Sequence, residues 1–134
     1  MGKKFKRDLS SLGDIFEFID EFSVKTGLDE SVVFTMNLVV EELFTNMVKY
    51  TSGNTNKILL ELKKEENNLI IHLTDFDVDP FDITETAEVD TKQSLEERRV
   101  GGLGIHLVKE MMDKIEYEYK DRQSKIILIK HLEN

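Results

Sequence analysis

The sequence predicts an α+β fold, a two-layer α/β sandwich in which helices cover one face of a mixed, mainly antiparallel sheet. Two helical patterns come first along the chain, and paired strand patterns with alternating apolar residues follow them. The chain has 134 residues, of which 40% are hydrophobic, and this is enough for one domain with a substantial core. We therefore expect residues 1–134 to form a single domain.

The N-terminal part is expected to contain a strand and a helix. The strand lies near Lys4 to Arg7, and the helix runs from about Leu9 to Thr26. Apolar residues at helical spacing indicate this helix: Leu12, Ile15, Phe16, Ile19 and Phe22. Gly27 ends it, because glycine adopts the left-handed backbone that closes a helix.

A second helix is expected to be the longest buried element. Asp29 or Ser31 caps its start, and it continues to about Tyr50. Its inner stripe follows the helical period: Val32, Met36, Val40, Leu43 and Met47.

The middle of the chain indicates a β-hairpin followed by a long loop. Two alternating runs, Lys57 to Lys64 and Leu69 to Thr74, flank the polar turn EENN. Residues 76–100 then contain many acids and show no periodicity. A loop of that length inside a compact domain usually has a functional role or is mobile.

The C-terminal part is expected to form a helix and a second hairpin. The helix runs from Gly104 to Lys114. Strands from Ile115 to Lys120 and from Lys125 to Leu132 enclose the turn DRQS.

Composition excludes several classes of function. The formal net charge is −9, which repels a nucleic-acid backbone and makes a nucleic-acid partner unexpected. The chain has no cysteine, and its three scattered histidines do not form a metal cluster. Its basic start lacks the apolar run of a signal peptide, and no stretch approaches the ~18 apolar residues that span a bilayer. We expect a cytoplasmic protein without a membrane partner.

Three glycines, Gly101, Gly102 and Gly104, lead directly into the last helical pattern. Without side chains, they allow backbone N–H groups to approach an anion at the positive end of a helix. A phosphate cradle is one interpretation, and an ordinary tight turn or packing contact is the other.

The second helix carries a pair of polar residues. Glu42 and Asn46 are four positions apart and therefore lie on one helical face. A carboxylate and an amide oxygen at the edge of a core suit a proton acceptor and a hard cation such as Mg²⁺. Alternatively, Glu42 is a solvated acid and Asn46 bridges locally. Glu41, turned by about 100°, should face solvent.

Asp75 lies in TDFDVDPFD, at the end of the second hairpin strand. There it could accept a hydrogen bond from a ligand amine in a half-buried pocket, or it could cap the following turn. A calcium loop is disfavoured, because the glycine and the distal glutamate of an EF-hand are missing.

The order of these motifs carries more information than any one of them. Three motifs in this order resemble the N, G1 and G2 boxes of the GHKL superfamily: EELFTNMVKY, TDFDVDPFD and RRVGGLGIHLVKEMMD. This superfamily contains the histidine-kinase-like ATPases with the Bergerat ATP-binding fold. The small size and the closing pattern IEYEYKDRQSKIILIKHL look most like the stand-alone anti-sigma-factor serine kinases of the RsbW and SpoIIAB type. The resemblance covers nearly the whole chain and is firmest from about Asp29 onward.

The resemblance implies a role for each matching residue. Glu42 matches the general base, and Asn46 matches the ligand of the Mg²⁺ bound to ATP. Asp75 matches the aspartate that accepts a hydrogen bond from the adenine amino group, and Ser124 falls near a family serine or threonine close to adenine. Lys49 and Arg98 are candidates for neutralising phosphate charge. The G2 box contributes residues that border the lid and lie against the phosphates: Gly101, Gly102, Leu103, Gly104 and Ile105.

One departure from the family pattern matters for nucleotide binding. Asp77 stands in the nucleotide-binding G1 box where the family usually has glycine. Its bulk and negative charge are expected to reduce nucleotide affinity or to change the path of the loop. The following residues, from Asp79 to Asp82, resemble the PFDP wording of the stand-alone branch.

The resemblance implies an ATP-dependent protein serine kinase that sequesters a sigma factor and phosphorylates a serine on an anti-anti-sigma protein of the STAS type. It also implies ATP or ADP and Mg²⁺ as ligands, a homodimer, and a lid of residues 84–100 that closes over the phosphates. The alternative is a non-catalytic or weakly nucleotide-binding regulator with the same fold. The catalytic domain of a histidine kinase is disfavoured, because no helical hairpin with a phosphoacceptor histidine precedes the N box.

Overall fold

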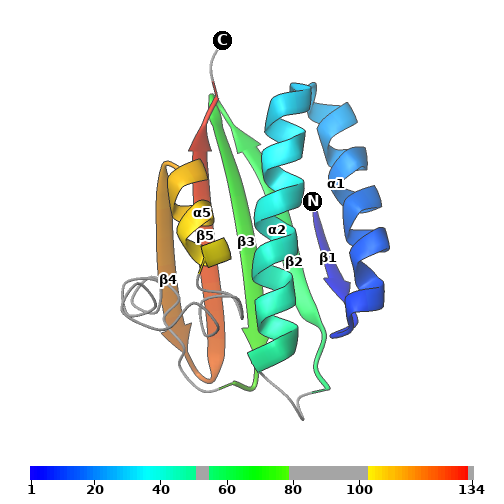
Figure 1. Cartoon of the computed structure of the whole chain (residues 1–134), viewed down its shortest axis with the longest axis vertical. Coiled ribbons are helices and arrows are strands. Elements are labelled where there is room, and N and C mark those ends of the chain that lie inside the picture. The colour runs from blue at the N-terminus through cyan, green and yellow to red at the C-terminus, as the bar shows by residue number, and fades with distance from the viewer. Residues whose placement is uncertain (51–54, 79–102, 133–134) are drawn as a thin grey trace.

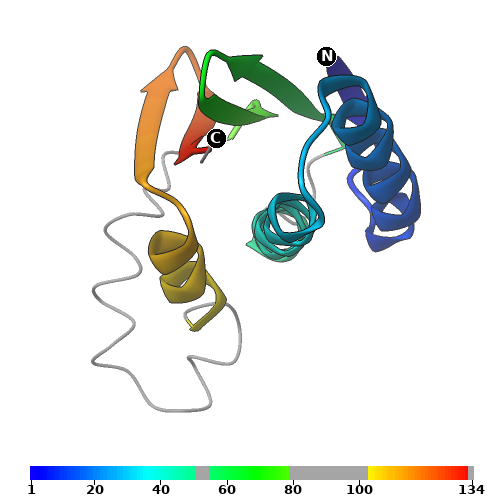
Figure 2. The same cartoon turned by 90° about the horizontal axis from the view of Figure 1, so that it is seen from above.

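Helices cover one face of a five-stranded sheet with the strand order β1-β2-β3-β5-β4 (Figure 1). The computed structural model describes residues 1–50, 55–78 and 103–132. All four neighbouring strand pairs are antiparallel. Seen from above, the helices lie on one side of the curved sheet (Figure 2). The predicted α+β two-layer architecture is confirmed, and the sheet, which was expected to be mixed and mainly antiparallel, is antiparallel at all four strand pairs.

The N-terminal segment forms β1 (Gly2–Phe5), a 3-10 turn η1 (Leu9–Ser11) and α1 (Leu12–Thr26). The strand was expected near Lys4 to Arg7 but lies two residues earlier. The Asp8 carboxylate accepts a hydrogen bond from the Ser10 amide at 3.0 Å, and this cap turns the chain away from the sheet before Leu9. Gly27 ends α1 in the left-handed conformation, with a φ of 67°, as expected.

Helix α2 (Glu30–Tyr50) is the long core helix. Of its predicted inner stripe, Met36, Val40 and Leu43 are buried, and the core also includes Val39 and Phe44, which the stripe did not contain. Val32 and Met47 pack against this core while remaining partly exposed.

By length and by its mean hydropathy of 1.2, the stretch Glu30–Lys49 of α2 is apolar enough to cross a membrane. No such stretch was expected from the sequence, because charged residues such as Glu41 and Glu42 interrupt its apolar residues. The core helix of a soluble protein passes the same test, and the buried residues of α2 pack in the core shared with the sheet.

The first hairpin consists of β2 (Ile58–Glu65) and β3 (Asn68–Phe76). Glu65 pairs with Asn68, so the turn contains only Glu66 and Asn67 and is tighter than predicted. Strand β3 also continues past the predicted end at Thr74, which places Asp75 inside the strand.

Helix α5 (Leu103–Met111) is followed by β4 (Lys114–Lys120) and β5 (Gln123–His131). The helix ends three residues before the predicted Lys114, which begins β4 instead. The turn of this hairpin contains Asp121 and Arg122, with positive φ values of 52° and 61°. Most of the predicted loop of residues 76–100 lies outside the described residues.

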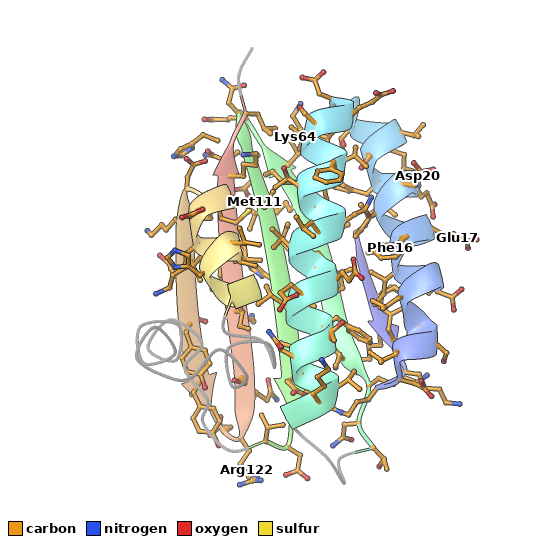
Figure 3. All side chains as sticks on the ribbon, viewed as in Figure 1. Phe16, Glu17, Asp20, Lys64, Met111 and Arg122 are labelled. Atoms are coloured by element: carbon orange, nitrogen blue, oxygen red, sulfur yellow. The ribbon has the colours of Figure 1, made fainter. Side chains whose placement is uncertain are left out.

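The core lies between the sheet and the helices. Its buried side chains come from α1, α2 and the inner face of β2, β3 and β5, together with Phe5 of β1, Val108 of α5 and Met112 just after α5. Figure 3 shows Glu17 and Asp20 on the outer side of α1, whereas Met111 lies between α5 and α2.

Candidate functional site

Several of the predicted site residues that the structure describes lie toward one end of the molecule. The C-terminal end of α2, the end of β3 and the start of β5 lie together there (Figure 1). In this region, Asn46, Asp75 and Ser124 are buried polar residues within an otherwise apolar core. Buried polar groups of this kind are uncommon unless they pair with one another or contact a ligand.

Glu42 and Asn46 share the inner side of α2. Asn46 is 3% exposed and Glu42 is half-buried, whereas Glu41 is exposed to solvent as predicted. Burial raises the pKa of Glu42, and Lys49 and the Asn46 amide oppose this effect in part. A carboxylate with a raised pKa is a stronger proton acceptor once ionised, which suits a general base.

Unsatisfied polar atoms accompany these residues. Although the Asn46 amide approaches Glu42, its Nδ2 makes no hydrogen bond of normal geometry. The buried Thr74 Oγ1 also makes none, but Thr74 and Asp75 are consecutive in β3, so their side chains point to opposite faces of the sheet. An unpaired buried polar atom costs roughly 1–3 kcal/mol, so Asn46 Nδ2 marks a place where an accepting group of a ligand would be stabilised.

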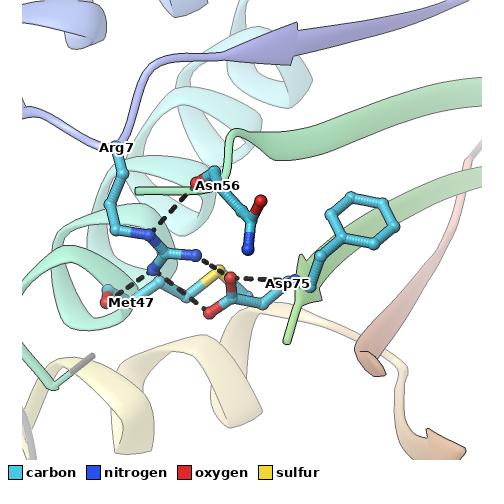
Figure 4. Close-up of polar contacts among 5 residues, drawn as sticks. Arg7, Met47, Asn56 and Asp75 are labelled. Carbon is cyan, nitrogen blue, oxygen red and sulfur yellow. Dashed lines mark hydrogen bonds and ion pairs between the residues drawn. The ribbon is translucent and has the colours of Figure 1, made fainter. Parts of the chain in front are cut away.

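Asp75 is held in place by Arg7, which was not among the site residues expected from the sequence. Arg7 Nη2 donates to Asp75 Oδ1, and Nη1 donates to Oδ2 at 3.3 Å (Figure 4). The Phe76 amide also donates to Oδ1, at 3.1 Å. The two side chains are 5% and 4% exposed, so this is a buried ion pair.

Ser124 lies directly beside Asp75, because these two residues are partners in the register of β3 and β5. Its hydroxyl donates to the Tyr117 hydroxyl at 3.0 Å. The structure therefore brings together the two residues that were expected close to an adenine ring.

Asp77 adopts the backbone conformation that a glycine would adopt at this position. Its φ is 56°, in the left-handed region. Its carboxylate is exposed and accepts a hydrogen bond from Arg122 Nε at 2.8 Å, in the turn between β4 and β5. The next amide, of Val78, donates to the Arg122 carbonyl at 3.0 Å. The side chain therefore faces solvent and the neighbouring hairpin.

The remaining predicted residues are placed only in part. Lys49 is exposed near the end of α2. Leu103, Gly104 and Ile105 begin α5, as expected for a helix that follows a glycine-rich turn. Three predicted residues and the proposed lid lie outside the described residues: Arg98, Gly101, Gly102 and the range 84–100.

Comparison with known proteins agrees with this arrangement of motifs. The model of the histidine kinase-like ATPase domain matches residues 5–130. The chain belongs to this family. The resemblance that its three ordered motifs indicated is therefore confirmed, and an ATPase domain implies that the protein binds a nucleotide.

Two curated relatives of this histidine kinase-like ATPase domain are named as kinases. The serine/threonine-protein kinase BtrW of Bordetella bronchiseptica is 22% identical over 120 residues, which is 88% of this chain and 84% of BtrW. The serine-protein kinase RsbW of Listeria monocytogenes is 25% identical over 121 residues, which is 81% of this chain and 71% of RsbW.

The described part of the candidate site offers few metal ligands. Across residues 1–50, 55–78 and 103–132, no group of three His, Asp or Glu side chains could hold a metal ion. A divalent cation at this site would therefore depend on the substrate phosphates and on single protein ligands. The buried Asn46 side chain fits such a role through its amide oxygen, whereas its unpaired Nδ2 is a hydrogen-bond donor that suits a phosphate oxygen.

Proposed function

We propose that this protein is an ATP-dependent protein serine kinase that also binds a sigma factor and phosphorylates a serine on an anti-anti-sigma protein of the STAS type. The observation that carries the proposal is the convergence of Glu42 and Asn46 on α2 with Asp75 and Ser124 on the paired strands. The names of the two kinases to which the chain is similar support the same activity.

Each residue has a chemical task in this proposal. Glu42 accepts the proton of the substrate serine hydroxyl, whose oxygen forms a bond to the γ-phosphorus of ATP. The bond between that phosphorus and the β,γ-bridging oxygen breaks, and ADP leaves. Asp75 accepts a hydrogen bond from the adenine amino group, with Ser124 beside it, and Lys49 contributes positive charge near the phosphates.

Asn46 is the residue proposed to hold Mg²⁺. When bound, this cation neutralises negative charge on the transferring phosphoryl group. The amide oxygen is a hard ligand of the type that Mg²⁺ prefers. Among the residues that the structure describes, no cluster of three carboxylate or imidazole ligands is present, so the phosphates and water would complete the coordination.

The proposal extends to parts of the protein that the structure does not describe. We propose that residues 1–134 act as a single domain, that residues 84–100 form the ATP lid, and that Arg98, Gly101 and Gly102 contact the phosphates. We also propose a cytoplasmic homodimer. These proposals rest on the family resemblance.

The first experiment measures binding of ATP and ADP to the purified protein by calorimetry, with and without Mg²⁺. Binding that depends on Mg²⁺ is expected, and its absence would contradict the proposal at its base. A kinase assay then uses a STAS-type protein recovered by pull-down in ADP, with phosphoserine detected by mass spectrometry.

The second experiment separates catalysis from binding. Glu42→Ala is expected to bind ADP normally and to lose phosphoryl transfer by about 10²–10⁴-fold, because the proton acceptor is gone. Glu41→Ala, the exposed neighbour, serves as the control and should keep its activity. If Glu42→Ala transfers phosphate at the normal rate, the assignment of the base is wrong.

A second candidate function is a non-catalytic partner-switching regulator that uses nucleotide weakly or not at all. The observation that favours it is Asp77 in place of the expected glycine. An Asp77→Gly variant that gains ATP affinity by more than tenfold would support this candidate. The outward orientation of the Asp77 side chain argues for the kinase instead, because the charge lies away from Asp75 and is paired with Arg122.

A further inference from the structure

The ion pair between Arg7 and Asp75 has a geometry that points to a task in ligand recognition. Both carboxylate oxygens of Asp75 accept hydrogen bonds from the same guanidinium group (Figure 4). This bidentate arrangement fixes the orientation of the carboxylate. The pair is nearly closed to solvent. Asp75 therefore cannot rotate without breaking two hydrogen bonds at once.

Arg7 is itself anchored by other parts of the fold. Its Nη1 donates to the Met47 carbonyl at 3.3 Å, and its Nε donates to the Asn56 carbonyl at 3.2 Å (Figure 4). These carbonyls belong to the end of α2 and to the segment before β2. A guanidinium held by two carbonyls in addition to a carboxylate is part of a rigid support and not a gate that must swing away.

We propose that Arg7 is a positioning residue that fixes the Asp75 carboxylate as a hydrogen-bond acceptor and thereby sets the preference for a purine with an amino group at position 6. This inference rests on the proposed function, in which Asp75 contacts adenine. The sequence resemblance assigned no role to Arg7.

The hydrogen-bonding capacity of Asp75 is consistent with this task. An ionised carboxylate offers about four accepting positions. Among the described residues, Oδ1 accepts from Arg7 and the Phe76 amide, while Oδ2 accepts from Arg7 alone. Oδ2 can therefore accept a further donor, such as the adenine amino group. Hypoxanthine has a carbonyl oxygen at that position, and two acceptors facing each other are unfavourable.

The experiment compares ADP with inosine diphosphate, which carries hypoxanthine, by calorimetry on the full chain. Arg7→Met keeps an unbranched side chain but removes the charge and all five donors. We expect it to bind ADP at least tenfold more weakly and to lower the ratio of ADP to inosine diphosphate affinity at least tenfold. Lys63→Met removes an exposed ion pair with Glu65 on β2 and should change neither quantity.

A double-mutant cycle tests whether Arg7 acts through Asp75. Asp75→Asn alone should lower the ADP preference. If Arg7 works through that carboxylate, adding Arg7→Met to Asp75→Asn leaves the ratio unchanged within about twofold. A further tenfold fall in the ratio would show that Arg7 acts independently and would overturn the inference.

The remaining outcomes also decide the question. A wild-type protein that binds neither nucleotide overturns the proposed function and this inference together. The inference alone is overturned if the wild-type protein binds ADP but Arg7→Met has the same ratio of ADP to inosine diphosphate affinity. It is also overturned if Arg7→Met binds ADP more tightly than the wild-type protein does. If circular dichroism shows that Arg7→Met is unfolded, Arg7→Lys replaces it in the experiment, because lysine keeps the charge but cannot form the bidentate contact. The ratio of ADP to inosine diphosphate affinity should then fall at least threefold. An unchanged ratio would contradict the inference.

Discussion

Glu42 occupies a half-buried position in which its charge is costly. Its raised pKa means that the folded protein binds this proton more tightly than the unfolded chain does. The ionised Glu42 therefore destabilises the folded protein. This effect is absent below pH 4.5, the pKa of Glu42 in the unfolded chain, and is fully present above its raised pKa in the folded protein.

The Glu42→Gln variant should accordingly unfold at a higher temperature than the wild-type protein at pH 8. The difference should shrink as the pH falls through the raised folded pKa and should disappear below 4.5, where both side chains are neutral in both states. Thermal unfolding followed by circular dichroism at several pH values measures this. Glu41→Gln, on the exposed side of the helix, should show no such dependence, and equal behaviour of the two variants would contradict the assigned burial effect.

At Asp77, the structure answers a question that the sequence raised. The left-handed φ costs a non-glycine residue about 1–2 kcal/mol, while the exposed ion pair with Arg122 returns at most about 1 kcal/mol. Asp77→Gly should therefore stabilise the fold by about 0.5–1 kcal/mol in urea unfolding. Asp77→Asn removes the charge but tolerates the same φ, so it should have little effect. A loss of stability in Asp77→Gly would mean that the ion pair outweighs the backbone strain.

At the residue scale, the sequence identified the polar side chains of the site but not their mutual contacts. Glu42 and Asn46 could be predicted on one face because helical spacing is regular. Arg7 could not be found in this way, because it meets Asp75 only after β1 and β3 have joined the same sheet. A single arginine after a short strand carries no local signal of such a partner.

Among the elements, the hairpin between β2 and β3 closes with only two residues. Glu66 has a φ of 54°, which favours glycine, whereas Glu65 is extended in the strand. Glu66→Gly should stabilise the protein and Glu65→Gly should destabilise it, each by about 0.5–1 kcal/mol. Urea unfolding of the two variants provides the comparison, since the chemical change is identical. Effects of the same sign would contradict the assigned turn.

Element types were predictable, and the ends of elements were less so. Alternating apolar residues located β2 through β5 because one face of the sheet is buried and the other is not. The ends depended on local contacts that periodicity does not report, such as the Asp8 cap that shifts β1 and the left-handed pair at Asp121 and Arg122 that shortens the last turn.

For the whole molecule, stability depends on a single core between the sheet and the helices. Phe44 is fully buried, whereas Phe34 on the same helix is 65% exposed. Phe44→Ala should lower the free energy of unfolding by about 3–5 kcal/mol, and Phe34→Ala by less than about 0.5 kcal/mol. Denaturant unfolding of both variants measures the difference, and similar losses would show that α2 packs differently.

The central place of β3 also has a consequence for synthesis. Asp75 lies between Arg7, near the start of the chain, and Ser124, in the last strand, and β3 pairs with both β2 and β5. A chain that leaves the ribosome N-terminus first therefore cannot complete the surroundings of Asp75 until β5 has emerged. ATP in the cell can stabilise the finished protein by mass action but gives no help to the nascent chain.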